Sequence, residues 1–218
     1  MRKHVITLLL SFVMIGGTVE ASDLFKKFHI TVKPTGLLAL SGYYNDSTKL
    51  REAVNPGLGF GVGFRYELSN NVYLDFGYSY NWLSVKEDYR LFDYQHQMPA
   101  FEMQNFVLNG NFYLKSGYFI EPYLTLGGGI SYWKFSQDTF GSGVWPAPGN
   151  SEESFSDISP LLNIGLGVEV FAFKLFSIVC EVKYNYLFSR NPAKFKTDDF
   201  TQQDYLTLHL GVVFRFGK

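Results

Sequence analysis

The residues of this chain that could do chemistry are charged side chains spaced two apart within segments that are otherwise apolar. Arg65 and Glu67 show this spacing in one segment, and Glu181 and Lys183 show it in another. Side chains alternate across a β-strand, so residues two apart point to the same side. The spacing therefore predicts one charged face, and its candidate members are Lys33, Arg65, Lys115, Lys183 and Arg215 with Glu67, Asp75, Glu121, Glu169 and Glu181.

Five cations and five anions on one face favour a network of ion pairs. Buried charges are tolerated when they are paired, so the first interpretation is a salt-bridged plug inside a closed sheet. The alternative is a gate, in which Arg65 with Glu169, or Arg215 with Glu121, exchanges partners to open a pore. His209 has the same parity, and we interpret it as an interior histidine with a partner; the alternative is a pH switch, since histidine titrates near neutrality.

Catalytic and metal-binding groups are sparse in the sequence. A nucleophile needs a base within hydrogen-bond reach. His96 and Asp93 are neighbours in sequence, and the candidate hydroxyls follow in a later segment at Ser142, Ser151, Ser154 and Ser156. Cys180 is the only cysteine, so it forms no internal disulfide and is interpreted as a small hydrophobe. We therefore predict no catalytic residue, no metal and no cofactor.

Strand-like segments must position the charged face. In the last of them, leucine, valine and phenylalanine alternate with threonine, histidine, glycine and arginine up to Phe216. Eight segments alternate in this way, the first interrupted by Pro34, which strands tolerate mainly at edges, bulges and ends. They lie at about 28–44, 57–68, 72–82, 105–114, 120–132, 162–170, 176–188 and 205–216.

The connections between these segments differ in length by parity. Short turns are expected at 69–71, 116–119 and 172–175, and long loops at 45–56, 87–100, 136–160 and 189–204. Short turns at one end and long loops at the other are typical of outer-membrane barrels. The predicted fold class is all-β, an eight-stranded antiparallel transmembrane β-barrel, and the alternative is a soluble lipocalin-like barrel, whose interior would be apolar.

The two faces of the predicted barrel differ along its height. We expect most of the charges in the periplasmic half of the interior. In the outer half the inward positions are small or polar, namely Gly57, Gly59, Ser79, Asn81, Ser131 and Asn163. Outward aromatic residues at the strand ends predict an interfacial girdle of Tyr80, Trp82, Tyr132, Tyr184, Tyr186 and Phe188.

Residues 1–21 have the pattern of a secretory signal peptide. Arg2 and Lys3 precede an apolar run, and small residues lead to an expected cleavage after Ala21, which leaves 22–218 as the barrel domain. The run is too short to span a membrane, and the alternative is an uncleaved anchor. The net charge of -1 gives no basic face for nucleic acid, so we predict no nucleic-acid partner.

Three stretches carry a resemblance to a known family. "GLGFGVGFRYELSNNVYLDFGYSY" at 57–80, "EPYLTLGGGISYWKF" at 121–135 and "VVFRF" at 212–216 resemble the small eight-stranded outer membrane proteins, which include the OmpA transmembrane domain, OmpX and OmpW. The resemblance implies location in the outer membrane of a diderm bacterium, with membrane lipids and the barrel assembly machinery as partners. Gly217 and Lys218 depart from the family, whose members usually end on the aromatic residue.

Two shorter stretches, "VKPTG" at 32–36 and "HQMPA" at 96–100, are similar to OmpW, and this similarity implies passage of small hydrophobic solutes. The expected function is a non-enzymatic structural or narrow-channel role. One alternative is a surface adhesin that binds host or matrix ligands through its long loops, with Phe140 and Trp145 as anchors. The remote alternative is a lipid A-modifying barrel enzyme.

Overall fold

The alternating segments form the long strands of a closed barrel in this computed structural model. The structure describes residues 27–45, 48–86, 88, 100–114, 119–136, 156–171, 175–189 and 203–216. The barrel strands are β1 (Phe28–Ser41), β4 (Gly57–Ser69), β5 (Val72–Ser84), β6 (Ala100–Tyr113), β7 (Ile120–Ser136), β8 (Ser156–Val170), β9 (Phe176–Leu187) and β10 (Gln203–Arg215).

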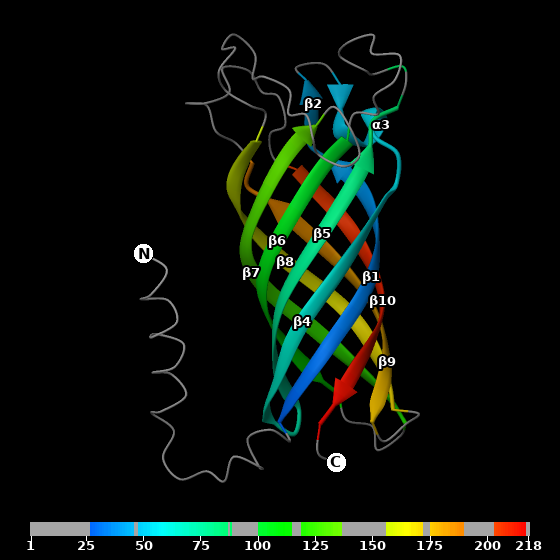
Figure 1. Cartoon of the computed structure of the whole chain (residues 1–218), viewed down its shortest axis with the longest axis vertical. Helices are drawn as coiled ribbons and strands as arrows, with labels where there is room; N and C mark the ends of the chain where they lie inside the picture. The colour runs from blue at the N-terminus through cyan, green and yellow to red at the C-terminus, as the bar shows by residue number, and fades with distance from the viewer. Residues whose placement is uncertain are drawn as a thin grey trace.

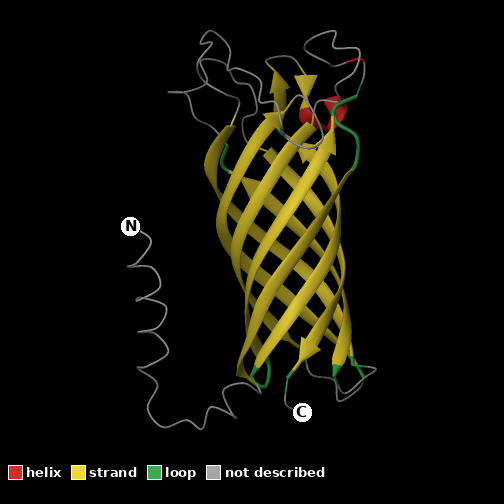
Figure 2. Cartoon of the chain, viewed as in Figure 1, coloured by secondary structure: helices red, strands yellow, loops and turns green. Residues whose placement is uncertain are grey.

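All neighbouring strands are antiparallel, in the order β1-β10-β9-β8-β7-β6-β5-β4, and β4 pairs back with β1 (Figure 1). The strands form a continuous wall with no free edge (Figure 2). The predicted eight-stranded antiparallel β-barrel is thus confirmed. We call the end with the β4–β5 turn the turn end, and the opposite end the loop end.

Small elements cover part of the loop end. β2 (Tyr43–Asn45), β3 (Thr48–Lys49) and α3 (Leu50–Ala53) follow β1 there (Figure 1). Gly42 turns the chain into them with a φ of 98°, a conformation that glycine adopts without strain. A bridge between Val54 and Val85 ties the end of this segment to the extension of β5. The long connection predicted over 45–56 therefore joins two barrel strands as expected, and it contains short elements that the sequence did not predict.

Five strands extend further toward the loop end than the sequence predicted, β5 and β10 by two residues each and three others by more. β6 begins at Ala100 rather than near 105, β7 ends at Ser136, and β8 begins at Ser156 rather than near 162. The predicted loop over 136–160 was therefore wrong at its last five positions, 156–160. The extensions of β6 and β7 escaped prediction because their inward positions, such as Met103 and Trp133, also become apolar there, which removes the contrast between the two faces. In β8 the inward Ser159 stays polar, and Pro160, a residue that strands tolerate poorly, interrupts the pattern.

The outward and inward faces of the barrel have opposite chemistry. Outward side chains such as Leu58, Phe64 and Leu210 are about three-fifths exposed. Inward side chains such as Arg65 and Trp133 are at most 1% exposed. A continuous apolar outer wall around a partly polar interior is the arrangement of a transmembrane barrel and the reverse of a lipocalin-like one.

Several predictions of the sequence fall outside the described residues. They are the signal peptide at 1–21, Lys115, the His96 and Asp93 pair, and Ser142, Ser151 and Ser154. Ser156, which the sequence assigned to a loop, instead begins β8 opposite Lys134 with its side chain buried. Among the described helices, none combines the length and the apolar character needed to cross a bilayer.

Candidate functional site in the barrel interior

Glu169 of β8 is the centre of a buried polar layer near the turn end. Its two carboxylate oxygens contact two guanidinium groups, with Arg65 Nη1 at 2.8 Å and Arg215 Nη2 at 2.5 Å. The hydroxyls of Tyr113 and Ser177 also donate to this carboxylate. Glu169 and Arg65 are each 1% exposed, so these charge-assisted bonds form away from solvent, where they are strong.

Asp75 joins this centre to a second group of charges. It accepts from Arg65 Nη2 at 3.2 Å and from Lys33 Nζ at 3.1 Å. Lys33 Nζ also lies 3.8 Å from Glu181 Oε1, which in turn contacts Lys183 Nζ at 2.9 Å. The chain of contacts from Arg215 to Lys183 therefore runs across the barrel interior, and we call these seven charged residues the ion-pair layer.

Aromatic rings support the ion-pair layer from the turn end. Tyr73, Tyr113 and Tyr123 form a run of rings with centroids 4.9 and 4.8 Å apart. The Tyr123 hydroxyl donates to Glu181 at 2.9 Å. The Arg65 guanidinium lies 5.9 and 6.0 Å from the Tyr73 and Tyr113 ring centroids, within the range of cation–π attraction. Packing thus restricts the side chains that carry the charges.

The structure brings most of the predicted charged face together. Lys33, Arg65, Asp75, Glu169, Glu181, Lys183 and Arg215 are joined by the contacts above, and the predicted pair of Arg65 with Glu169 is among them. The pair of Arg215 with Glu121, named for the gate alternative, is not among these contacts, and Arg215 instead lies 2.5 Å from Glu169. Glu121 stands on β7, three strands from β10, whereas Glu169 on β8 is only two strands away.

Three predicted members lie at the margin of the layer. Glu121 is buried opposite Glu169 in the β7–β8 register. Glu67 is half-buried at the turn end and forms no ion pair with the described residues. His209 Nδ1 lies 2.8 Å from the Thr35 hydroxyl, so this histidine has a hydrogen-bond partner inside the barrel.

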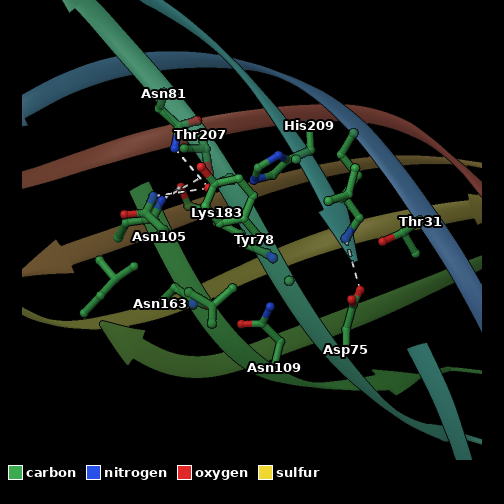
Figure 3. A pocket seen from close by; sticks show the side chains of 18 residues that line it. Thr31, Asp75, Tyr78, Asn81, Asn105, Asn109, Asn163, Lys183, Thr207 and His209 are labelled. Carbon is green, nitrogen blue, oxygen red and sulfur yellow. Dashed lines mark hydrogen bonds and ion pairs between the residues drawn. The ribbon is translucent and has the colours of Figure 1, made fainter. Parts of the chain in front are cut away.

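Asparagines surround a cavity of about 60 Å³ in the middle of the barrel. Asn81, Asn105, Asn109 and Asn163 line it together with Lys183 and His209 (Figure 3). Glycines on neighbouring strands make room for two of these amides. A Cβ on Gly59 would stand 2.1 Å from Asn81 Oδ1, and one on Gly127 would stand 2.1 Å from Asn109 Oδ1. We call this cavity the asparagine chamber.

An apolar cluster fills the interior at the loop end. The strands contribute Leu37, Ala39, Leu83, Phe101, Met103, Trp133, Leu161, Leu187 and Tyr205, and the segment after β3 contributes Leu50, Ala53 and Val54, with Val85 packed among them. Trp133 is fully buried and donates from Nε1 to Ser159 Oγ at 2.9 Å. We call this cluster the apolar plug. The expectation that the outer half of the interior is only small and polar was therefore wrong at this level.

The barrel is similar in structure to known outer membrane proteins. Neisserial surface protein A superimposes with a TM-score of 0.55 at 18% identity, over 87% of this chain and 97% of that one. The outer membrane protein OprG from Pseudomonas aeruginosa superimposes with a TM-score of 0.51 at 13% identity, over 88% and 97%. The chain has the fold of the small outer-membrane barrels. No protein-family model matches the sequence, and the search of curated proteins finds no match either.

The outer wall of this membrane barrel carries two carboxylates that the sequence pattern did not single out. Glu102 on β6 has outward parity, and it accepts from the Tyr80 hydroxyl at 2.6 Å and from Lys134 Nζ at 3.2 Å. Asp204 on β10 accepts from the Tyr184 hydroxyl at 2.7 Å. Two tyrosines predicted for the girdle thus hold polar groups at the loop end of the apolar wall, as expected at a membrane interface.

The described residues offer little for other chemistry. No group of three or more histidine, cysteine, aspartate or glutamate side chains that could hold a metal occurs among them. Cys180 is exposed on the outer wall, where it lines an apolar hollow with residues such as Leu166 and Val182.

Proposed function

We propose that this chain is a non-enzymatic outer membrane barrel with a structural role, and that its interior does not conduct. The observation that carries this proposal is the pair of closures around the asparagine chamber. The apolar plug fills the loop end of the interior, and the ion-pair layer fills the section toward the turn end. An eight-stranded barrel is just wide enough for side chains to fill, so two packed layers leave no continuous path.

The charges of the ion-pair layer support a permanent closure. Four cations and three anions form it, and the buried Glu121 beside Glu169 brings a fourth anion. Counted over the described residues, these charges balance and give no net charge that would attract a passing ion. Removing one partner leaves another charge buried without compensation, which costs about 3–5 kcal/mol. A gate that opened by separating Arg65 from Glu169 would have to meet a cost of this order.

Passage of small hydrophobic solutes, which the OmpW-like stretches imply, would need an apolar cavity that opens between strands. The cavity inside the barrel is lined by asparagines and charges. The apolar hollow of about 360 Å³ lies on the outer wall, where Leu114, Pro122 and Cys180 line it. A structural role therefore agrees better with the described cavities than solute passage does.

The alternative of a surface adhesin depends on exposed aromatic residues in the long loops. The anchors that the sequence offers, Phe140 and Trp145, lie outside the described residues. Binding of host or matrix ligands therefore stays a prediction of the sequence.

Single-channel conductance of the refolded mature protein in a planar bilayer tests the proposal. We expect no conductance steps from the parent, from Arg65→Ala or from Leu161→Ala, because each variant keeps one of the two closures. Val62→Ala on the outer wall serves as the refolding control. Discrete steps from the parent would contradict a sealed barrel. Steps from Arg65→Ala alone would make the ion-pair layer the gate of a channel.

A further inference from the structure

The apolar hollow on the outer wall contains a row of three small outward side chains. They are Pro122 on β7, Val168 on β8 and Cys180 on β9. The register sets Pro122 opposite Val168 and Val168 opposite Cys180, so the three residues lie side by side on neighbouring strands. Neighbouring strands are about 4.8 Å apart, so the row is about 10 Å long. We call this hollow of about 360 Å³ the wall hollow.

Larger side chains stand at the edges of this row. Leu114, which is 71% exposed, bounds it on the β6 side, where its backbone N–H donates to the Pro122 carbonyl at 2.9 Å. Leu166 lies two residues from Val168 on the same face of β8 and is 68% exposed. The wall hollow therefore results from a local decrease in side-chain size between protruding leucines.

The lining of the wall hollow is almost entirely hydrocarbon. Tyr123 and Gly167 also contribute to it, but the Tyr123 side chain is buried inside the barrel and its hydroxyl donates to Glu181. The described lining contains no charged side chain, and the thiol of Cys180 is a weak hydrogen-bonding group. A ligand of this surface must therefore be apolar.

The wall hollow lies close to the turn end of the barrel. Pro122 follows Ile120, the first residue of β7, by two positions, and Val168 precedes Val170, the last residue of β8, by two. Short turns of outer-membrane barrels face the periplasm. The surroundings of the hollow are therefore the hydrocarbon of the periplasmic leaflet.

We propose that the wall hollow binds one acyl chain of a phospholipid from the periplasmic leaflet. The hollow is continuous with the apolar wall that contacts lipid, so hydrocarbon chains reach it directly. An unfilled hollow would deprive its lining of dispersion contacts, and a flexible chain restores them by lying along the row. The leucines at the edges hold this chain, which separates it from the lipids that cover the rest of the wall.

A second copy of the barrel is a poorer match to the same surface. Within lipid no hydrophobic force drives two apolar walls together, so their association depends on close packing of small residues or on polar contacts. The protruding Leu114 and Leu166 keep a second wall away from the small side chains between them. A single acyl chain is narrow enough to pass between these leucines.

Photo-crosslinking of the refolded mature protein in dodecyl maltoside micelles tests the proposal. The probe is a phosphatidylethanolamine with a diazirine in one acyl chain, and mass spectrometry locates and quantifies the crosslinked peptides. We expect crosslinks at Pro122 and Cys180 to saturate near one probe per barrel. Crosslinks at Phe64 and Phe76, on the opposite part of the outer wall, should rise in proportion to the probe.

Competition with unlabelled lipid separates a binding site from general coating of the wall. A tenfold excess of unlabelled phosphatidylethanolamine over a saturating amount of probe should reduce the crosslinks in the wall hollow about tenfold. The crosslinks at Phe64 should change little, because the detergent remains in large excess. Crosslinks in the hollow that neither saturate nor respond to the competitor would overturn the proposal.

A matched pair of variants locates the site. Val168→Phe fills the wall hollow and should reduce the crosslinks at Pro122 and Cys180 at least fivefold. Val62→Phe makes the same change elsewhere on the outer wall and should leave them unchanged. Cys180→Leu also fills the hollow and is read at Pro122, so the test does not depend on the folding of one variant. Unchanged crosslinks in both filling variants would overturn the proposal.

Sedimentation of the same samples tests for the second copy. A dimer that Val168→Phe dissociates, without competition by lipid, would assign the wall hollow to protein contact and overturn the proposal. The result is independent of conductance, because the wall hollow lies outside the barrel and the two closures lie inside it. Failure of the lipid site and failure of the sealed-barrel function are therefore distinguished by different measurements.

Discussion

The ion-pair layer and the apolar plug each fill a section of the barrel interior, but they do so by opposite chemistry. Around Glu169, each oxygen of one carboxylate has its own guanidinium partner, so the layer depends on direction and on every member. Around Trp133, the plug depends on volume and on exclusion of water. The comparison implies that the layer fails when one partner is removed, whereas the plug tolerates exchanges that keep its volume.

The largest effect is expected from Glu169→Ala. The substitution leaves Arg65 and Arg215 buried without their shared carboxylate, and we expect it to lower the free energy of unfolding by about 3–5 kcal/mol. Urea unfolding of the refolded protein, followed by tryptophan fluorescence, measures the loss. Combining Glu169→Leu with Arg65→Met should recover part of it, because apolar replacement of a buried ion pair is often tolerated. A double variant no more stable than Glu169→Ala would contradict the inference that the ion-pair layer fails because a charge is left without its partner.

A smaller loss is expected in the plug from Leu161→Ala. Truncation of this buried leucine leaves a cavity, and the expected cost is about 3 kcal/mol. Leu161→Met is the matched control and should cost less than about 1.5 kcal/mol, since volume is retained. The same urea titration measures both. Equal losses in the two variants would show that the plug, like the ion-pair layer, requires particular side chains.

Gly167→Ala tests the aromatic support beneath the ion-pair layer. A Cβ at this position would stand 2.3 Å from Tyr123 Cζ, so the Tyr123 ring must move and its bond to Glu181 is disturbed. We expect a loss of about 1–3 kcal/mol. Gly36→Ala, where a Cβ meets nothing within 4 Å, is the control and should stay near the parent. Similar urea midpoints of unfolding for the two variants would mean that the position of the Tyr123 ring does not affect the stability of the ion-pair layer.

The smallest effect is expected from Glu102→Gln on the outer wall. The amide oxygen of glutamine still accepts from the Tyr80 hydroxyl, and only the ionic part of the contact with Lys134 is lost. Glu102 is itself only 2% exposed, but the amide keeps its hydrogen bonds and leaves no unpaired carboxylate, so we expect a change of about 1 kcal/mol in the same titration. A loss as large as that of Glu169→Ala would show that an ion pair at the membrane interface behaves like one buried in the barrel.

Most of the correct predictions about the barrel wall came from the alternation of apolar and polar side chains. It placed Arg65 and Glu169 on the inner face and Phe64 on the outer face, and the structure agrees at these positions. Alternation with a period of two predicts these faces correctly because each strand position in a membrane barrel faces either the lipid or the interior. The alternation could not predict the ion-pair partner of Arg215. It indicates which side of the sheet a residue faces, and it does not indicate which residue lies across the barrel.

The apolar plug had a signal in the sequence that alternation alone conceals. Leu83 follows Asn81 by two residues, Trp133 follows Ser131 by two, and Leu187 follows Asn185 by two. Each plug residue therefore continues the inward parity of a polar one. β5 and β7 were ended too early because a segment that is apolar on both faces no longer alternates in hydrophobicity, although its side chains still alternate in direction.

The sequence by itself determined the number of strands, their two faces and the class of barrel, because these follow from local spacing and from the lengths of the connections. Only the tertiary structure decided which charges meet, where the interior turns apolar and that a polar chamber lies between the ion-pair layer and the apolar plug. Those features depend on the stagger of strands around a closed sheet. That stagger places Lys33 of β1 in contact with both Asp75 of β5 and Glu181 of β9, although the three strands are far apart in the sequence.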